Sequence, residues 1–278
     1  MAKTGTGGGG KPDLATLLGF VIAAAGILGG LIFEGGKIKD ILQFTAAMIV
    51  LGGTVGAVMI ATPLRVLKGA ANRLAGIFMD ASPSFGNLIE LLVGYASKAR
   101  KGGLVGLEED AQATNDLFLK KALMLVVDGT DLQELRAMLE IDIALDEQHG
   151  EEEAKVLESA GGFSPTIGII GAVLGLIQVM KNLANIDEVG HGIAVSFVAT
   201  VYGVGAANLL FLPAAAKIKA AIHLETQRKE MILEAVCSII EGINPKLIRA
   251  KLEGYTHAET VKAKKPGAQP QTEPVTES

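Results

Sequence analysis

Four long apolar stretches without a single Lys, Arg, Asp or Glu constrain this chain more than any other feature. They are residues 14–33, 41–64, 159–180 and 189–216. A bilayer core about 30 Å thick needs roughly 20 apolar residues of helix to cross it. Each stretch is long enough, and we therefore expect a protein that spans a membrane four times.

The composition supports a membrane protein and argues against an enzyme. Hydrophobic residues make up 49% of the chain, and 35 of its 278 residues are glycine, which lets membrane helices approach closely. Cys237 is the only cysteine, so the chain can form neither an intrachain disulfide nor a multi-cysteine metal site. The four histidines are scattered, and no catalytic spacing is visible.

The lack of charge in the four stretches limits what they can do alone. An ion that crosses such helices finds no ionisable side chain of this protein to bind. An autonomous channel or transporter would be expected to show an intramembrane charge or broken helices that line its own site. We therefore expect that a partner supplies the carboxylate if this protein moves ions.

Basic residues indicate how the chain is oriented. They gather before the first stretch, after the second at residues 65–73 and after the fourth at residues 217–229. By the positive-inside rule, both termini and the long insert face the cytoplasm, although Lys37, Lys39 and Lys181 lie on the other side. Acidic residues outnumber basic ones in the insert, so nucleic acid is not an expected partner.

The insert carries helix signals rather than strand signals. Ser82-Pro83 is typical of a helix start, and Gly102-Gly103 of its end. Asp128-Gly129 indicates a turn, and Thr130 with Gln133 fits a capping box. We expect an all-α polytopic membrane protein with four transmembrane helices and a helical cytoplasmic domain inserted between helices 2 and 3.

The expected organisation follows from these signals. It comprises a cytoplasmic N-terminus (1–13), transmembrane helices 1 and 2 (14–64), a cytoplasmic helical domain (65–158), transmembrane helices 3 and 4 (159–216), C-terminal cytoplasmic helices (217–255) and a disordered tail (256–278).

Small and hydroxyl residues recur at helical spacing in the last two stretches. They are Gly168, Gly171, Ala172 and Gly175 in the third, and Ser196, Thr200, Gly203 and Ala207 in the fourth. Close helix packing accounts for most of them. The hydroxyls either bond their own backbone carbonyls or line a pore, and the sequence pattern leaves both open.

Two prolines lie where the third stretch starts and the fourth ends. Pro165 and Pro213 each remove a backbone donor, and in antiparallel helices we expect them at about the same depth. Pro165 either starts its helix or bends it. Helical residues continue on both sides of Pro213, so it is expected to bend its helix.

Several segments resemble one family. They are GGFSPTIGIIGAVLGLI (161–177), GHGIAVSFVATVYGVGAANLLFLPAAAKI (190–218), EGINPKLIRAKLEGY (241–255) and FEGGKIKDILQFTAAMIVLGGTVGAVMI (33–60). Together they are similar to the A subunit of the flagellar motor stator, the MotA/PomA family. The resemblance extends from Leu14 to Tyr255.

The resemblance implies an assembly in the bacterial inner membrane. Family members form a homo-pentamer around a dimer of the B subunit (MotB/PomB type), whose transmembrane Asp binds the translocated ion, and ion flow turns the A ring. Thr200 matches the threonine that faces this Asp, with Ala172 and Ser196 beside it on the ion path. Pro165 and Pro213 match the prolines that couple ion binding to the cytoplasmic helices.

A rotor-contact motif is implied by the segment ARKGGLVGLEED at residues 99–110. Arg100 and Glu108 match the two charged residues of the family that contact the rotor protein FliG. They lie eight residues apart across a Gly-Gly break, so they need not pair with each other as i,i+4 neighbours would.

The expected ion is the proton, and no cofactor is expected. Sodium-driven members usually have Thr where this chain has Ala172, and a neighbouring hydroxyl such as Thr166 is the alternative supplier of that oxygen. The related ExbB/TolQ proteins, proton-driven energisers of outer-membrane processes, remain the alternative function. They usually have three spans and lack the Arg100/Glu108 motif in this form.

Overall fold

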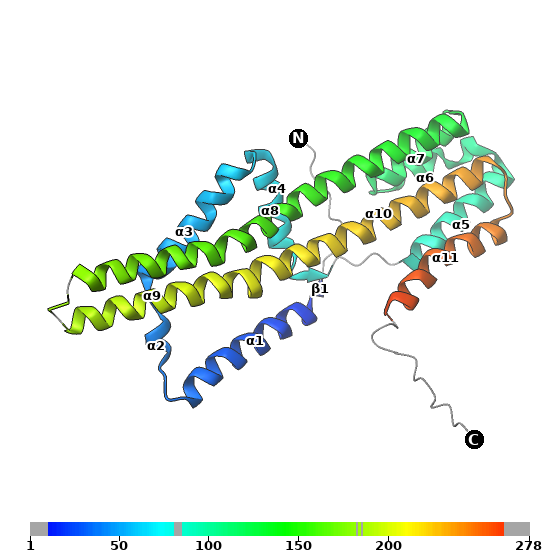
Figure 1. Cartoon of the computed structure of the whole chain (residues 1–278). Coiled ribbons are helices and arrows are strands. Elements are labelled where there is room, and N and C mark those ends of the chain that lie inside the picture. The colour runs from blue at the N-terminus through cyan, green and yellow to red at the C-terminus, as the bar shows by residue number, and fades with distance from the viewer. Residues whose placement is uncertain (1–10, 81–84, 182, 185, 264–278) are drawn as a thin grey trace, which may run out of the picture. The chain divides into compact units, whose positions relative to one another are not determined.

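Four helical stretches have the length and apolarity of a membrane span. In a computed structural model that describes residues 11–80, 85–181, 183–184 and 186–263, they are α1 (Leu14–Phe33), α3 (Phe44–Ala61), α8 (Leu132–Lys181) and Val189–Ile240 (Figure 1). The last stretch comprises most of α9 (Ile186–Ala206), a π-helical segment, η2 (Ala207–Phe211), and α10 (Leu212–Ile240). The prediction of four spans is confirmed.

The remaining elements are mostly helical. They are α2 (Ile38–Ile41), α4 (Leu64–Gly76), α5 (Phe85–Gly102), η1 (Leu104–Leu107), α6 (Glu108–Ala113), α7 (Leu117–Val127) and α11 (Pro245–Ala263). A two-residue antiparallel pairing joins β1 (Lys11–Pro12) to β2 (Met79–Asp80). The all-α prediction is confirmed for the described residues, and Ser82-Pro83 lies outside them.

The chain divides into two compact units. Among the described residues, we call 11–80, 145–181, 183–184 and 186–224 the span unit, because they include α1, α3 and the apolar parts of α8 and α9. The described residues 85–144 and 225–263 form the insert unit. The segment between the second and third spans therefore folds largely with the C-terminal helices.

In the span unit, α8 and α9 approach until their backbones touch. A methyl group on Gly203 would lie 2.6 Å from the carbonyl oxygen of Ser164 and 3.0 Å from the Cα of Gly168. A methyl group on Gly168 would lie 2.9 Å from the carbonyl oxygen of Ala199. Because no side chain fits there, glycine is required, and the packing interpretation is confirmed for this pair. We call this contact the glycine seam.

The third span is not a separate helix. α8 runs without interruption from Leu132 to Lys181 and contains Pro165 in its interior. The interpretation that Pro165 starts a helix is therefore wrong. A proline inside a helix removes one hydrogen bond and crowds the carbonyl four residues before it, and it is accommodated where neighbouring helices hold the flanking turns.

The start of α8 also differs from the expected capping box. Asp131, rather than Thr130, accepts a hydrogen bond from the backbone N–H of Gln133 at 2.9 Å. The N–H of Thr130 instead bonds the Leu125 carbonyl at 3.1 Å and so closes α7, with Gly129 at φ 72°. This is the usual left-handed helix ending, and it leaves Asp131 as the cap.

Pro213 follows a π-helical segment. The N–H of Leu212 bonds the carbonyl of Ala207, five residues earlier, and Pro213 comes next. In a regular α-helix the proline ring would collide with the carbonyl four residues before it. The wider turn relieves this collision, so α9 and α10 continue through the proline without a break.

Lys217 ties the start of α1 to α10. Its ammonium donates to the Asp13 carboxylate, to the Thr16 hydroxyl at 2.6 Å and to the carbonyl of Ile77. Asp13 also caps α1 by accepting from the Ala15 N–H at 2.9 Å. The hydrogen bond from Lys217, with the others from Thr16 and Ala15, lowers the pKa of Asp13 to about 2.

The insert unit has its own apolar core. α5 lies against α11, and the fully buried side chains of this unit include Leu92, Leu107, Leu119, Leu123, Leu135, Leu139, Met231, Ile232, Ile248 and Leu252. α11 extends to Ala263, beyond the expected boundary at Tyr255. Ala258, Glu259 and Lys262 are good helix formers, which explains the continuation. Residues 264–278 of the expected tail lie outside the described residues.

The glycine seam generates a test. Gly203→Ala should lower the free energy of unfolding by about 1–3 kcal/mol, because its methyl group meets backbone that cannot move aside. Gly205→Ala, two residues along the same helix, places its methyl where nothing lies within 4 Å and should be nearly neutral. Thermal unfolding in detergent, followed by circular dichroism, measures both. Equal unfolding midpoints for the two variants would contradict the close backbone contact at Gly203.

The Asp13–Lys217 pair predicts a pH dependence. Because the folded pKa of Asp13 is about 2 and its ordinary value is 3.8, the ionised group stabilises the fold above this window. Asp13→Asn keeps a capping side chain but loses the charge, so its unfolding midpoint should lie below that of the wild type. The difference should be constant above about pH 5 and shrink as the pH falls through the window. Melting curves across this range measure it, with the exposed Asp128→Asn as control.

Candidate functional site

The hydroxyls of Ser196 and Thr200 on α9 lie beside the glycine seam. Ser196 is buried and donates to the carbonyl of Gly192 at 2.9 Å, and the half-buried Thr200 donates to the carbonyl of Ser196 at 3.3 Å. Both protons are thus used within the helix, as expected when such hydroxyls bond their own backbone carbonyls. Each hydroxyl oxygen still has acceptor lone pairs, so Thr200 can receive a hydrogen bond from an acidic group of a partner.

Ala172 lies on α8 between the levels of these hydroxyls. An added methyl on Gly168 would come within 3.5 Å of the Thr200 Cα, and one on Gly175 within 3.0 Å of the Ser196 nitrogen. Ala172 stands between those two glycines and is half-buried. The structure therefore brings Ala172, Ser196 and Thr200 to one section of the α8–α9 pair, with no oxygen at position 172.

The two prolines flank this section but are offset. The side chain of Leu212, next to Pro213, would be 2.6 Å from a methyl group on Gly161, which precedes Pro165 by four residues. Four residues of helix rise by about 6 Å. The expectation of equal depth is therefore corrected to an offset of about one helical turn, which follows from the register in which α8 and α9 pack at the glycine seam.

Arg100 and Glu108 stand on either side of a sharp corner in the insert unit. Arg100 is exposed in the last turn of α5, and Glu108 is exposed at the first position of α6. Between them the chain reverses at Gly103, with φ 79°, and forms η1. We call residues 100–113 the charged corner.

The charged corner is held by residues that the sequence reasoning missed. Lys98 of α5 donates to the Asp110 carboxylate of α6 at 2.7 Å, and this hydrogen bond raises the pKa of Lys98. Below the corner, Leu107 and Ala111 are fully buried. The sequence shows opposite charges on the two sides of the Gly-Gly break, which was the available signal for this ion pair. It does not show the turn geometry that brings Lys98 and Asp110 together.

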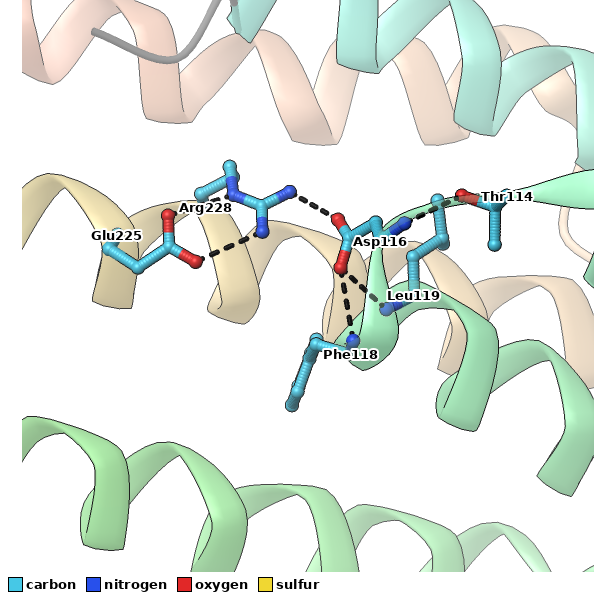
Figure 2. Close-up of polar contacts among 6 residues, drawn as sticks. All are labelled: Thr114, Asp116, Phe118, Leu119, Glu225 and Arg228. Carbon is cyan, nitrogen blue, oxygen red and sulfur yellow. Dashed lines mark hydrogen bonds and ion pairs between the residues drawn. The ribbon is translucent and has the colours of Figure 1, made fainter. Parts of the chain in front are cut away.

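A second ionic contact joins α7 to α10 (Figure 2). Asp116 caps α7 by accepting from the N–H groups of Phe118 and Leu119 at 3.0 and 3.1 Å, and its carboxylate also takes Arg228. Arg228 is fixed to its own helix by two 3.0 Å bonds to Glu225. Burial opposes ionisation of Asp116, but Arg228 and the two N–H groups outweigh it, and the pKa is lowered.

The described residues hold no cluster of three His, Cys, Asp or Glu side chains that could bind a metal ion. Beside the glycine seam, the span unit offers the hydroxyl oxygens of Ser196 and Thr200 and nearby backbone oxygens for hydrogen bonding. The insert unit displays the exposed charges of Arg100 and Glu108 on a fixed corner.

Comparisons with known proteins assign a family to this architecture. The sequence model of the MotA/TolQ/ExbB proton channel family matches residues 110–231, and that of the Motility protein A N-terminal region matches residues 17–103. The second match covers most of α1 and Arg100. ExbB/TolQ-like proteins are expected to lack the N-terminal span and the Arg100/Glu108 motif. The second match therefore favours the motility branch of the family.

Individual relatives cover nearly the whole chain. Motility protein A of Bacillus subtilis (strain 168) is 32% identical over 247 residues, which are 88% of this chain and 92% of the relative. The structure of C. jejuni MotAB matches with a TM-score of 0.84 at 34% identity, covering 87% of this chain and 95% of that one. The flagellar MotAB stator complex from Bacillus subtilis matches with a TM-score of 0.82 at 30% identity, covering 91% and 100%.

Proposed function

The chain belongs to the MotA/PomA family of flagellar stator A subunits, and we propose that it completes a proton path together with a stator B subunit. The observation that carries the proposal is the half-buried Thr200, an acceptor beside the glycine seam in spans without Lys, Arg, Asp or Glu. A path of this kind needs an ionisable group, which the B subunit supplies as its transmembrane Asp. The two solved relatives are complexes with MotB-type partners by their names, which supports this pairing.

Hydrogen-bond chemistry favours protons as the ion. Thr200 can accept from the protonated form of the partner carboxyl without moving, because its own proton is already bonded to Ser196. Ala172 adds no oxygen at the neighbouring level, so a dehydrated Na⁺ ion would find few ligands there. A proton that is carried by a carboxyl group needs no shell of oxygen ligands.

The assembly follows the family resemblance. We place five copies of this chain around two B subunits in the bacterial inner membrane, with both termini and the segment 65–158 in the cytoplasm. The charged corner then faces the rotor protein FliG, and its exposed Arg100 and Glu108 orient the encounter. Pro165 and Pro213 are the points at which ion binding moves α8 and α10.

Selective collapse of ion gradients tests the proposed ion. In cells that rely on this stator alone, swimming should stop when an ionophore abolishes the proton gradient and continue when the sodium gradient is abolished. Tracking swimming speed under each treatment measures this. Dependence on sodium would keep the stator function and overturn the ion assignment. Swimming that never depends on this chain would contradict its role in the motor.

Charge reversal tests the rotor contact. Arg100→Glu and Glu108→Lys should each reduce swimming strongly while membrane assembly is retained, because exposed charges steer an encounter but do not hold the fold. Lys246→Glu, at an exposed lysine of α11 outside the charged corner, is the control and should swim nearly as the wild type does. Speed and membrane fractionation are the two readouts. Unaltered swimming of the Arg100 variant would remove Arg100 from the interface.

A further inference from the structure

We propose that Arg228 and Asp116 form a positioning pair through which α10 holds and moves the charged corner. The inference rests on the proposed function, because it assumes that the charged corner delivers force to the rotor. It assigns a role to the contact in Figure 2 that neither the family resemblance nor the comparisons assign.

Asp116 is attached firmly to the end of the charged corner. α6 ends at Ala113, and the hydroxyl of Thr114 accepts from the Asp116 N–H at 3.3 Å. The Asp116 carboxylate then caps α7. A pull on this carboxylate therefore acts on the junction of α6 and α7, and α6 begins at Glu108.

Arg228 is equally well fixed on the other side. Its guanidinium uses Nε and Nη2 for Glu225, one turn earlier on α10, and Nη1 for Asp116. This fork geometry orients the head group so that it follows the helix rather than swinging freely. The side chains of Arg228 and Asp116 are only 19% and 21% exposed, so water and salt screen the pair less than a surface pair.

The helix that carries Arg228 also carries Pro213. α10 is uninterrupted from Leu212 to Ile240, directly after the π-helical segment. Rotation or tilt that begins at the proline is therefore transmitted along a continuous hydrogen-bonded helix to position 228. From there the ionic contact passes it to Asp116 and the charged corner.

Another interhelical pair of the same unit shows the contrast. Arg249 of α11 binds Glu90 of α5 through its two terminal guanidinium nitrogens, but the side chains are 38% and 64% exposed. Neither residue belongs to α10 or adjoins the charged corner. Such an exposed ion pair contributes little to stability. It therefore supplies a matched control for the Arg228–Asp116 pair.

The test separates capping from coupling. Asp116→Asn retains an oxygen that can cap α7 but loses the charge that Arg228 holds, and Arg228→Gln removes the fork. Each variant is expressed as the sole stator A subunit with the wild-type B subunit. The rotation speed of a bead tethered to a flagellum is recorded as stator units join the motor. The number of speed steps reports the number of stator units, and the height of each step reports the torque of one unit.

We expect the number of stator units to stay close to that of the wild type. The torque of each unit should fall about twofold or more, because this is the smallest effect expected when residues that transmit coupling are changed. The double variant should lose no more than either single variant, because both remove one contact. Glu90→Gln should leave torque per unit unchanged. The readout is specific, since a purely structural role would lower unit number and thermal stability instead.

Several outcomes would overturn the inference. They are unchanged torque per unit in both single variants, additive losses in the double variant, or an equal loss in Glu90→Gln. If Arg228→Gln does not assemble, Arg228→Lys is measured in its place. Wild-type torque per unit in both Arg228→Lys and Asp116→Asn would then count against the proposed role of the Arg228–Asp116 pair. A thiol-reactive dye on the buried Cys237 reports unfolding of the insert unit in each variant. Failure of the wild-type chain to drive rotation would refute the proposed function instead.

Discussion

The backbone contact between α8 and α9 is the constraint on which the rest of the span unit depends. At Gly168 and Gly203 the two helices leave no room for even one methyl group. In a bilayer, apolar burial does not hold helices together, so this closeness and its dispersion contacts are the main attraction between them. The same contact fixes Thr200 at the edge of the seam, where the residue is half-buried.

The two prolines disturb this pair without breaking it. Pro165 is accepted inside a fifty-residue helix, and Pro213 follows a turn widened to the π spacing. Each is a local loss of a backbone hydrogen bond in an otherwise continuous rod. Weak points of this kind are where a long helix bends most easily. The Lys217–Asp13 contact meanwhile fixes the start of α1 beside the second proline.

The insert unit is organised to present charge at a fixed place. Lys98 and Asp110 hold the corner across its glycine turn, and Arg228 holds its far end through Asp116. Exposed Arg100 and Glu108 are then carried by a scaffold with buried Leu107 at its base. Such an arrangement suits a contact that is made and released repeatedly, because rim charges orient a partner without binding it tightly.

The sequence by itself determined the spans and the helical class. A charge-free window of the right length has one low-energy state in a bilayer, and α1 begins and ends at the expected residues, Leu14 and Phe33. The tertiary structure decided what depends on distant partners or on competing caps. Nothing along the chain links Asp116 to Arg228. Thr130 and Asp131 are both plausible caps of α8, and the choice falls on Asp131 because the N–H of Thr130 bonds the end of α7. Local periodicity encodes burial and helix formation, whereas pairing and offset are settled only when helices pack.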